Sequence, residues 1–275
     1  MSVDYEQALL DFIKQYDKVL VAYSGGLDSA LVLWASVTAL GPERVWAVTS
    51  ESESYASGEA DRAVETAGAI GLRSEHYLRI KTRELENKEY AANPHNRCYF
   101  CKAELFSELT RIAGEKGIGV IFDGANVSDL GDYRPGAKAA EEFGVVSPLR
   151  EAGLDKDAIR AIARRHDLAV AEKAASACLA SRIPHGMVVT AERLGQIDRA
   201  ELAVRSLGFD GFRVRYHGEV ARLELRPDDI SRVLDDSIRE QVVTGIKNAG
   251  FRYVAVDLEG YRQGSLNSRE RTGEQ

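Results

Sequence analysis

Two sets of residues in this 275-residue chain have types and spacings that could do chemistry. The first is the stretch S-G-G-L-D-S at positions 24–29, and the second is the set of three cysteines, Cys98, Cys101 and Cys178. A glycine turn that leads into a helix can bind phosphate through backbone N–H groups and the helix dipole. Thiolates can bind metals or carry sulfur. The chain therefore combines a candidate phosphate site with candidate sulfur or metal chemistry.

The elements around the first stretch favour the phosphate interpretation. The apolar run at 19–23 is short and β-branched, as in a buried parallel strand, and the run at 30–39 is typical of a helix. Gly25 and Gly26 allow positive φ and close approach of a ligand, while Ser24 and Ser29 add hydroxyl donors. The plainer alternative is an ordinary turn in which Ser24 or Asp28 caps the helix.

The stretch differs from the two commonest phosphate-binding patterns. No lysine follows the glycines, as the Walker pattern requires, and the spacing G-x-G-x-x-G is absent. Instead, S-G-G-L-D-S resembles the PP-loop of ATP pyrophosphatases, which split ATP between the α- and β-phosphates. The resemblance implies that five residues of the loop bind ATP: Ser24, Gly25, Gly26, Asp28 and Ser29. It also implies that Mg²⁺ is bound to the ATP, with Asp28 or Asp123 as a possible ligand.

The rest of the first half alternates strands with helices. This order predicts a doubly wound parallel α/β sheet, which binds ligands at the carboxyl ends of its strands. The residues 123–126 follow such a strand end. We expect helices at 4–16, 30–39, 58–70 and 103–113, and strands at 19–23, 44–50, 75–80 and 120–123.

The pattern changes after Pro148. A small α+β domain with its own sheet is predicted, and His217-Gly218-Glu219 is expected to form a hairpin turn. We place the domain boundaries at 1–175 and 176–260, followed by a polar tail at 261–275 that we expect to be disordered. The expected elements are helices at 155–166, 190–207 and 228–250, and strands at 211–216, 220–225 and 252–258.

The cysteines leave several chemistries open. Cys98 and Cys101 would share one face of a helix that began near them, and a helix start lowers the thiol pKa. With Cys178 and His95 they could bind zinc. They could also form a redox pair with a persulfide on Cys178, or hold an iron–sulfur cluster on three thiolates. The remaining alternative is a buried, inert Cys178 and an accidental pair.

Four motifs together are more specific. The PP-loop, R-C-Y-F-C-K at 97–102, A-C-L-A-S-R-I-P-H-G at 177–186 and F-R-V-R at 212–215 resemble the LarE family over roughly residues 16–257. That family consists of ATP-dependent sulfur transferases that serve the nickel-pincer nucleotide cofactor. Because both the cysteine pair and Cys178 are present, this chain resembles the type in which three thiolates hold a [4Fe–4S] cluster.

The resemblance also implies a substrate and a reaction. A pyridinium mononucleotide with two carboxyl groups is adenylated, pyrophosphate leaves, and sulfur then displaces AMP to give thiocarboxylates. Sulfide or another sulfur donor is required. An iron without a thiolate ligand could hold the extra sulfide, so the protein would not be consumed.

Further residues are implicated by pattern and by resemblance. Arg213 and Arg215 alternate on one strand face, which suits a phosphate, although a solvated basic face would look the same. In the family the matching arginines bind the substrate phosphate, and Ser181 and Arg182 would sit beside the reacting sulfur. Asn126, Asp129 and Arg134 resemble nucleotide-side residues, Glu201 and Glu224 resemble carboxylates around a divalent ion at a subunit contact, and Arg97 and Lys102 could supply positive charge near a cluster.

The composition limits the classes of partner that we expect this protein to bind. The formal charge of −7 and a sequence pI near 5.4 give no basic footprint for nucleic acid. No apolar run is long enough to span a bilayer, so we expect a soluble cytoplasmic protein, and the resemblance implies a trimer-based homo-oligomer. The alternatives are a PP-loop tRNA thiolase and a non-enzymatic ATP sensor.

Overall fold

The computed structural model describes residues 4–130, 135–172 and 177–262. The chain forms two units that interleave along the sequence. The first unit contains 1–52, 58–90 and 96–176, and the second contains 53–57, 91–95 and 177–275. Two short segments from the first half of the sequence therefore belong to the second unit.

A four-stranded parallel sheet forms the centre of the first unit. Its order is β3 (Tyr77–Lys81), β2 (Val45–Glu51), β1 (Val19–Ala22) and β4 (Ile121–Phe122). The two pairs Val19–Val45 and Leu20–Ile121 fix the register of the central strand against its neighbours. Such a sheet confirms the predicted α/β class.

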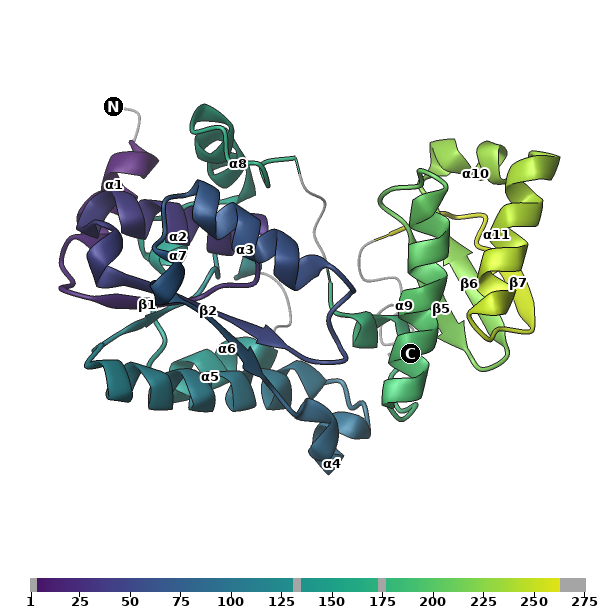
Figure 1. The fold of residues 1–275 in the computed structure, drawn as a ribbon, viewed down its shortest axis with the longest axis horizontal. Coiled ribbons are helices and arrows are strands. Elements are labelled where there is room, and N and C mark those ends of the chain that lie inside the picture. Colours follow the sequence, from purple (N-terminus) through teal and green to yellow (C-terminus); the bar gives the residue numbers. More distant parts are fainter. Residues whose placement is uncertain (1–3, 131–134, 173–176, 263–275) are drawn as a thin grey trace, which may run out of the picture. The chain divides into compact units, whose positions relative to one another are not determined.

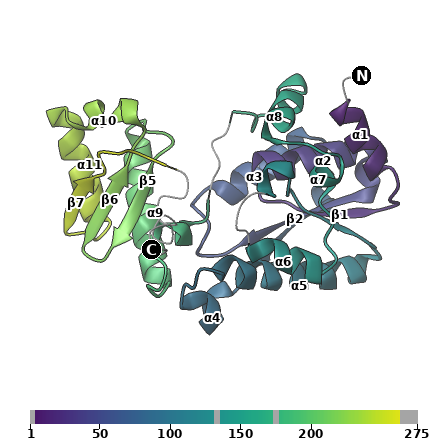
Figure 2. The same ribbon diagram turned by 180° about the vertical axis from the view of Figure 1, so that it is seen from behind.

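Helices cover both faces of this sheet, as Figures 1 and 2 show. Side chains of β1 alternate between two cores: Val19 and Val21 pack into one and Leu20 into the other. Both faces are apolar, which explains the unbroken apolar runs of the central strands. On the first face lie α1 (Tyr5–Ile13), α2 (Leu27–Leu40), α3 (Glu59–Ala69), α7 (Pro148–Glu151) and α8 (Lys156–Arg165); on the second lie α5 (Arg97–Lys116) and α6 (Pro135–Glu142).

The second unit is a three-stranded mixed sheet with helices on one face (Figure 2). Strands β5 (Arg213–His217) and β6 (Val220–Glu224) form the predicted hairpin, and Gly218 adopts φ +67° in its turn. Strand β7 (Tyr253–Val256) pairs parallel to β6. The helices are α9 (Ala191–Ser206), α10 (Pro227–Val233) and α11 (Asp236–Asn248).

Some predicted elements differ from the structure. The single helix expected at 228–250 is two helices, because Asp235 caps a new helix start by accepting from the backbone N–H groups of Ser237 and Ile238. The helix expected at 103–113 begins at Arg97, so it includes both cysteines of the pair. Neither α6 nor the short helix α4 (Lys88–Ala91) was predicted.

Two further findings concern the C-terminal residues and the membrane-spanning potential of the helices. Tyr261 lies at the start of the predicted tail, yet its backbone N–H donates to the carbonyl oxygen of Leu225 at 2.6 Å. Residues 263–275 lie outside the described residues. In the described part of the chain, every helix is too short or too polar to cross a membrane.

Candidate active site

The loop at 24–29 connects β1 to α2 and is shaped by its glycines. Gly25 adopts φ +68°, and a Cβ atom there would stand 2.7 Å from the Cβ of Ala63. Gly26 occupies the N-cap position of α2 without a side-chain capping bond, so neither Ser24 nor Asp28 caps the helix. Within the described ranges, the first turn of α2 thus has no side-chain cap at its N-terminus, which is the arrangement of an anion site.

The two serine hydroxyls hold the loop in shape. Their Oγ atoms lie 3.1 Å apart. Ser29 Oγ also accepts from the backbone N–H of Ser24 at 3.2 Å and donates to the carbonyl oxygen of Gly26 at 3.1 Å. The serines predicted to bind phosphate are thus brought together, and each helps to fix the turn.

Asp28 lies in the first turn of α2, opposite the end of β4. Its Oδ2 accepts from the ammonium group of Lys156, a partner that the sequence pattern did not suggest. Its Oδ1 is buried and has no hydrogen-bond partner in the described part of the chain. Gly124 allows the close approach of the β4 end, because a Cβ there would lie 3.0 Å from the backbone nitrogen of Ser29.

Asn126 and Asp129 form a capping box just after β4. The Asn126 side chain accepts from the backbone N–H of Ser128, and Asp129 accepts from that of Asn126. Asn126 is fully buried, and its Nδ2 finds no acceptor among the described residues. Both residues therefore cap this turn, while the buried Nδ2 donor of Asn126 is left for a ligand. Arg134 lies outside the described residues.

The residues present fit ATP. Among the residues that the structure describes, a buried carboxylate oxygen of Asp28 and the buried amide nitrogen of Asn126 have no hydrogen-bond partner, and Asp28 lies in the first turn of the helix that follows the glycine turn. Buried polar atoms without partners are rare, and a bound nucleotide with its Mg²⁺ would satisfy both kinds of atom. Asp123, the second candidate ligand, accepts from the backbone N–H of Ala125 at 3.1 Å.

Cys98 and Cys101 lie in the first turns of α5. Cys98 is exposed, and Cys101 is half-buried. The thiol of Cys101 donates to Oε1 of Glu84 at 3.6 Å, and the hydroxyl of Thr82 donates to the same oxygen at 3.0 Å. Glu84 is only 2% exposed, and its Oε2 has no hydrogen-bond partner within the described ranges. Sequence reasoning missed this carboxylate because nothing in its local pattern marks it.

Cys178 is presented by a buried turn of the second unit. The cysteine is exposed, whereas Leu179 and Ala180, which follow it, are buried. Arg182, at the end of the same turn, donates from Nη1 to the carbonyl oxygens of Ala177 (2.6 Å) and Cys178 (3.1 Å). It also donates to Ser181 Oγ at 3.0 Å. The guanidinium group thereby fixes the backbone that presents the sulfur.

Two buried ion pairs hold the arginines of this unit. Glu201 accepts from Arg182 through both oxygens, at 2.9 and 3.0 Å. Glu224 accepts from Arg215 at 2.9 Å, and Arg215 also donates to the carbonyl oxygen of Ser181 at 2.9 Å. The predicted divalent-ion role of Glu201 and Glu224 remains a prediction; in this structure both carboxylates neutralise buried guanidinium groups.

Arg213 is the third buried arginine beside this turn. Burial, and then the positive charge of Arg182, lowers its pKa from the ordinary value. Its guanidinium carbon lies 4.8 Å from the ring centre of Tyr261. Arg213 is 8% exposed and Arg215 is 5% exposed, so they do not form a solvated basic face.

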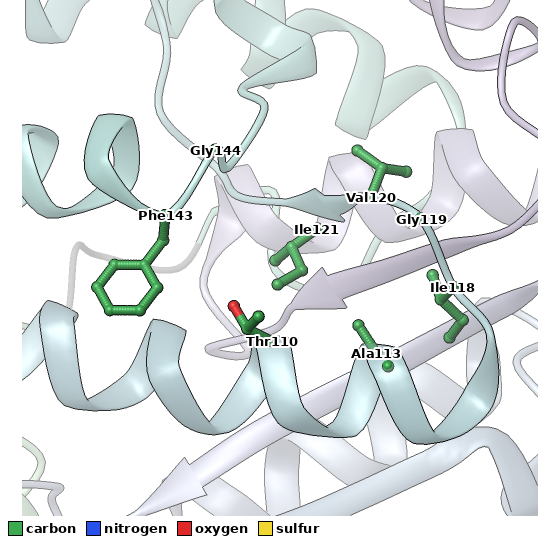
Figure 3. A pocket seen from close by; sticks show the side chains of 9 residues that line it. Thr110, Ala113, Ile118, Gly119, Val120, Ile121, Phe143 and Gly144 are labelled. Atoms are coloured by element: carbon green, nitrogen blue, oxygen red, sulfur yellow. The ribbon is translucent and has the colours of Figure 1, made fainter.

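The predicted sulfur residues are divided between the units, with Cys98 and Cys101 in the first and Cys178 in the second. Among the described residues, no three His, Cys, Asp or Glu side chains are grouped so that they could hold a metal ion. A cavity of about 250 Å³ in the first unit is shown in Figure 3. It is lined by residues of α5 such as Thr110 and Ala113, by residues 118–121 at the start of β4, and by Phe143 and Gly144 after α6, but by none of the predicted site residues.

The loop, sheet and strand-end residues define a PP-loop ATP pyrophosphatase. Consistent with this class, 60 residues (22% of the chain) are 45% identical to part of a glutamine-dependent NAD(+) synthetase of Xylella fastidiosa, of which they cover 11%. No family model matches the chain.

Two further relatives match nearly the whole chain. An uncharacterized protein of Synechocystis sp. is 42% identical, covering 94% of this chain and 95% of that protein. The pyridinium-3,5-bisthiocarboxylic acid mononucleotide synthase of Lactiplantibacillus plantarum is 36% identical, covering 94% of this chain and 92% of that protein. The chain therefore belongs to the LarE family of ATP pyrophosphatase-type sulfur transferases.

Proposed function

We propose that this enzyme adenylates the carboxyl groups of a pyridinium-3,5-dicarboxylate mononucleotide and replaces AMP with sulfur, in the synthesis of the nickel-pincer nucleotide cofactor. The observation that carries the proposal is the Cys178 turn. A sulfur group and buried arginines suited to a phosphate occur on the same small unit, in a chain that also has an ATP pyrophosphatase loop.

The first half of the reaction uses the loop of the first unit. A carboxylate oxygen of the substrate attacks the α-phosphorus of ATP, and the bond to the β-phosphate oxygen breaks to release pyrophosphate. The N–H groups at the start of α2 stabilise the phosphate charge. Asp28, which accepts from Lys156, would hold the Mg²⁺ of the nucleotide. This half turns a poor electrophile into a mixed anhydride with AMP as leaving group.

The second half uses a sulfur nucleophile. Sulfide attacks the activated carbonyl carbon, the bond to the AMP oxygen breaks, and a thiocarboxylate forms. Arg213 and Arg215 bind the phosphate of the substrate nucleotide in this proposal, because their fixed donors match phosphate oxygens. The guanidinium groups of Arg182, Arg213 and Arg215 are all buried in this unit, and such a concentration of positive charge favours an anionic ligand.

We further propose that Cys98, Cys101 and Cys178 hold a [4Fe–4S] cluster. Three thiols and no other cysteine fit the donor set of a cluster with one iron lacking a thiolate ligand. When bound, such a cluster would supply a coordination position for sulfur. In the present structure the Cys101 thiol donates a hydrogen bond to Glu84, and this bond would be lost when the cysteine binds iron as a thiolate.

Anaerobic purification with iron and sulfide analysis tests the cluster. We expect a yellow-brown protein with about four irons per chain, which Cys98→Ala should lose. Arg111→Ala on the exposed side of the same helix is the matched control and should keep the iron. A colourless zinc protein with full activity would contradict the cluster, and a persulfide on Cys178 found by mass spectrometry would favour a relay instead.

The reaction itself is tested by product analysis. Release of AMP and pyrophosphate should depend on the carboxylated pyridinium nucleotide, with thiocarboxylate formed in parallel. Turnover with tRNA but not with the nucleotide would overturn the proposed substrate. ATP binding without turnover of either would contradict the proposed reaction.

A further inference from the structure

Asn93 is a buried residue that joins two distant parts of the second unit. It belongs to the segment 91–95, which lies between α4 and α5 in sequence but within the second unit in space. The residue is fully buried. Its Nδ2 donates to the carbonyl oxygens of Ile183 (3.3 Å), Pro184 (2.8 Å) and Met187 (3.1 Å). One side chain thus gathers the carbonyl groups of a whole turn.

The backbone of Asn93 is unusual as well. Its φ is +57°, and in the described part of the chain the other non-glycine residue with positive φ is Asp167. Pro94 follows it, and a residue before proline normally adopts extended geometry. The carbonyl oxygen of Asn93 accepts from the backbone N–H of Gly186 at 2.9 Å. A strained conformation of this kind persists where the surrounding contacts determine it.

The chemistry of the junction requires a donor. Three carbonyl oxygens surround the terminal atom, so only an N–H or O–H group can face them without repulsion. The assignment of nitrogen rather than oxygen to this position follows from the same argument. Aspartate has the same shape as asparagine but would place a carboxylate oxygen against the three carbonyl groups.

The turn held by Asn93 continues directly from the turn of Cys178. Ile183 follows Arg182, and its backbone N–H donates to the carbonyl oxygen of Ala180 at 3.2 Å. At the other end, the N–H of Leu179 donates to the carbonyl oxygen of Ser54 at 2.8 Å. The Cys178 turn is therefore fixed on both sides by segments that come from elsewhere in the sequence.

We propose that Asn93 is a positioning residue for sulfur transfer. By holding the carbonyl groups of Ile183 and Pro184, it fixes the peptide that follows Arg182, and so the guanidinium group that clamps the Cys178 backbone. Asn93 itself acts through these groups and does not contact the reacting atoms in this proposal. The inference rests on the proposed function, in which Cys178 takes part in sulfur transfer.

The variant Asn93→Gly tests the amide alone, because glycine adopts positive φ readily. Asp167→Gly is the matched control: it removes an exposed side chain at the other positive-φ position. In the full-length protein we would measure the alkylation rate of Cys178 by iodoacetamide, using peptide mass spectrometry, and amide hydrogen exchange over residues 179–187. Steady-state assays would determine the kcat for sulfur transfer and the separate KM values for ATP and for the pyridinium nucleotide.

We expect Asn93→Gly to speed exchange across 183–187 and to change Cys178 alkylation several-fold. The kcat for sulfur transfer should fall roughly tenfold to a hundredfold, as misplaced groups lose rate, while the KM for ATP stays unchanged. Asp167→Gly should leave all of these unchanged. Asn93→Asp should reproduce the defect despite its matching shape, whereas wild-type exchange and alkylation in Asn93→Gly would overturn the proposal.

A second pair of variants covers the case in which Asn93→Gly does not fold. Gly186→Ala strains the partner of the Asn93 carbonyl (φ +79°), and Gly71→Ala strains a comparable glycine (φ +93°) in the first unit; an added Cβ meets no atom within 4 Å at either site. A defect in Cys178 alkylation confined to Gly186→Ala supports the proposal, and equal behaviour of the two variants overturns it. If the wild-type enzyme transfers no sulfur, the proposed function fails, while exchange and alkylation still test Asn93.

Discussion

The two units provide for anions in different ways. In the first unit, backbone N–H groups at the start of α2 form the candidate site, and small residues let the chain approach closely. In the second unit, buried guanidinium groups do so, each held by carboxylates or backbone carbonyls. The first site depends on the space available to the backbone and the second on the balance of buried charge. Substitutions in the two units should therefore impair the protein for different physical reasons.

The largest expected effect is the loss of a buried counter-charge. Glu201→Ala leaves the guanidinium group of Arg182 buried without its carboxylate partner, which should lower the free energy of unfolding by about 3–5 kcal/mol. Urea unfolding followed by circular dichroism measures this. Glu172→Ala removes an exposed partner of Arg164 and should leave the free energy of unfolding nearly unchanged, because water screens an exposed ion pair. Equal effects of the two variants would show that burial does not govern the second unit.

The next largest effect is expected on the binding of the substrate rather than on the stability of the fold. Arg213→Gln removes a charged donor from the proposed phosphate site, which should weaken substrate binding by about 1.5–3 kcal/mol. The KM for the pyridinium nucleotide should rise accordingly, while ATP affinity measured by calorimetry stays the same. A weaker ATP affinity with an unchanged KM for the pyridinium nucleotide would contradict this prediction, because it would show that Arg213 acts in ATP binding instead.

A smaller effect is expected where backbone space decides the outcome. Gly25→Ala introduces a Cβ that meets Ala63 at 2.7 Å on a backbone with φ +68°, so the loop should distort at a cost of about 1–3 kcal/mol and ATP should bind more weakly. Gly41→Ala is the control. Its φ is +81° and no atom lies within 4 Å of the added Cβ, so this variant introduces backbone strain without a steric clash. Normal ATP binding by Gly25→Ala would refute the role given to this glycine.

The smallest expected effect is a pH dependence in the first unit. Burial, with a contribution from the charge of Glu84, raises the pKa of the Glu104 carboxyl above its ordinary value of 4.5. Just above pH 4.5 the folded state then binds more protons at this group than the unfolded state, so its contribution to stability falls as pH rises. Glu104→Gln should flatten this slope in urea unfolding, whereas an unchanged slope would assign it to other groups.

The sequence predicted the parts that depend on neighbouring residues. The PP-loop is contiguous, so its strand, turn and helix could be recognised together, and the parallel sheet followed from alternating apolar runs. Partners far apart in the chain could not be recognised in this way. Lys156 pairs with a residue 128 positions away, and Asn93 contacts Pro184 across 91 positions. The helix break at Asp235 was missed because a capping aspartate looks like any other acidic surface residue.

The interleaving of the two units limits how this protein can be divided. A gene fragment that begins at residue 177 encodes the strands and helices of the second unit but omits the segments 53–57 and 91–95. Such a fragment would lack the carbonyl group of Ser54 that binds Leu179 and the hydroxyl group of Ser57 that binds Asp198. A chimera joined to another PP-loop protein at a single crossover would lose the same contacts. The unit that carries Cys178 therefore cannot be exchanged as a continuous module that begins at residue 177, because part of it is encoded within the half that carries the glycine loop.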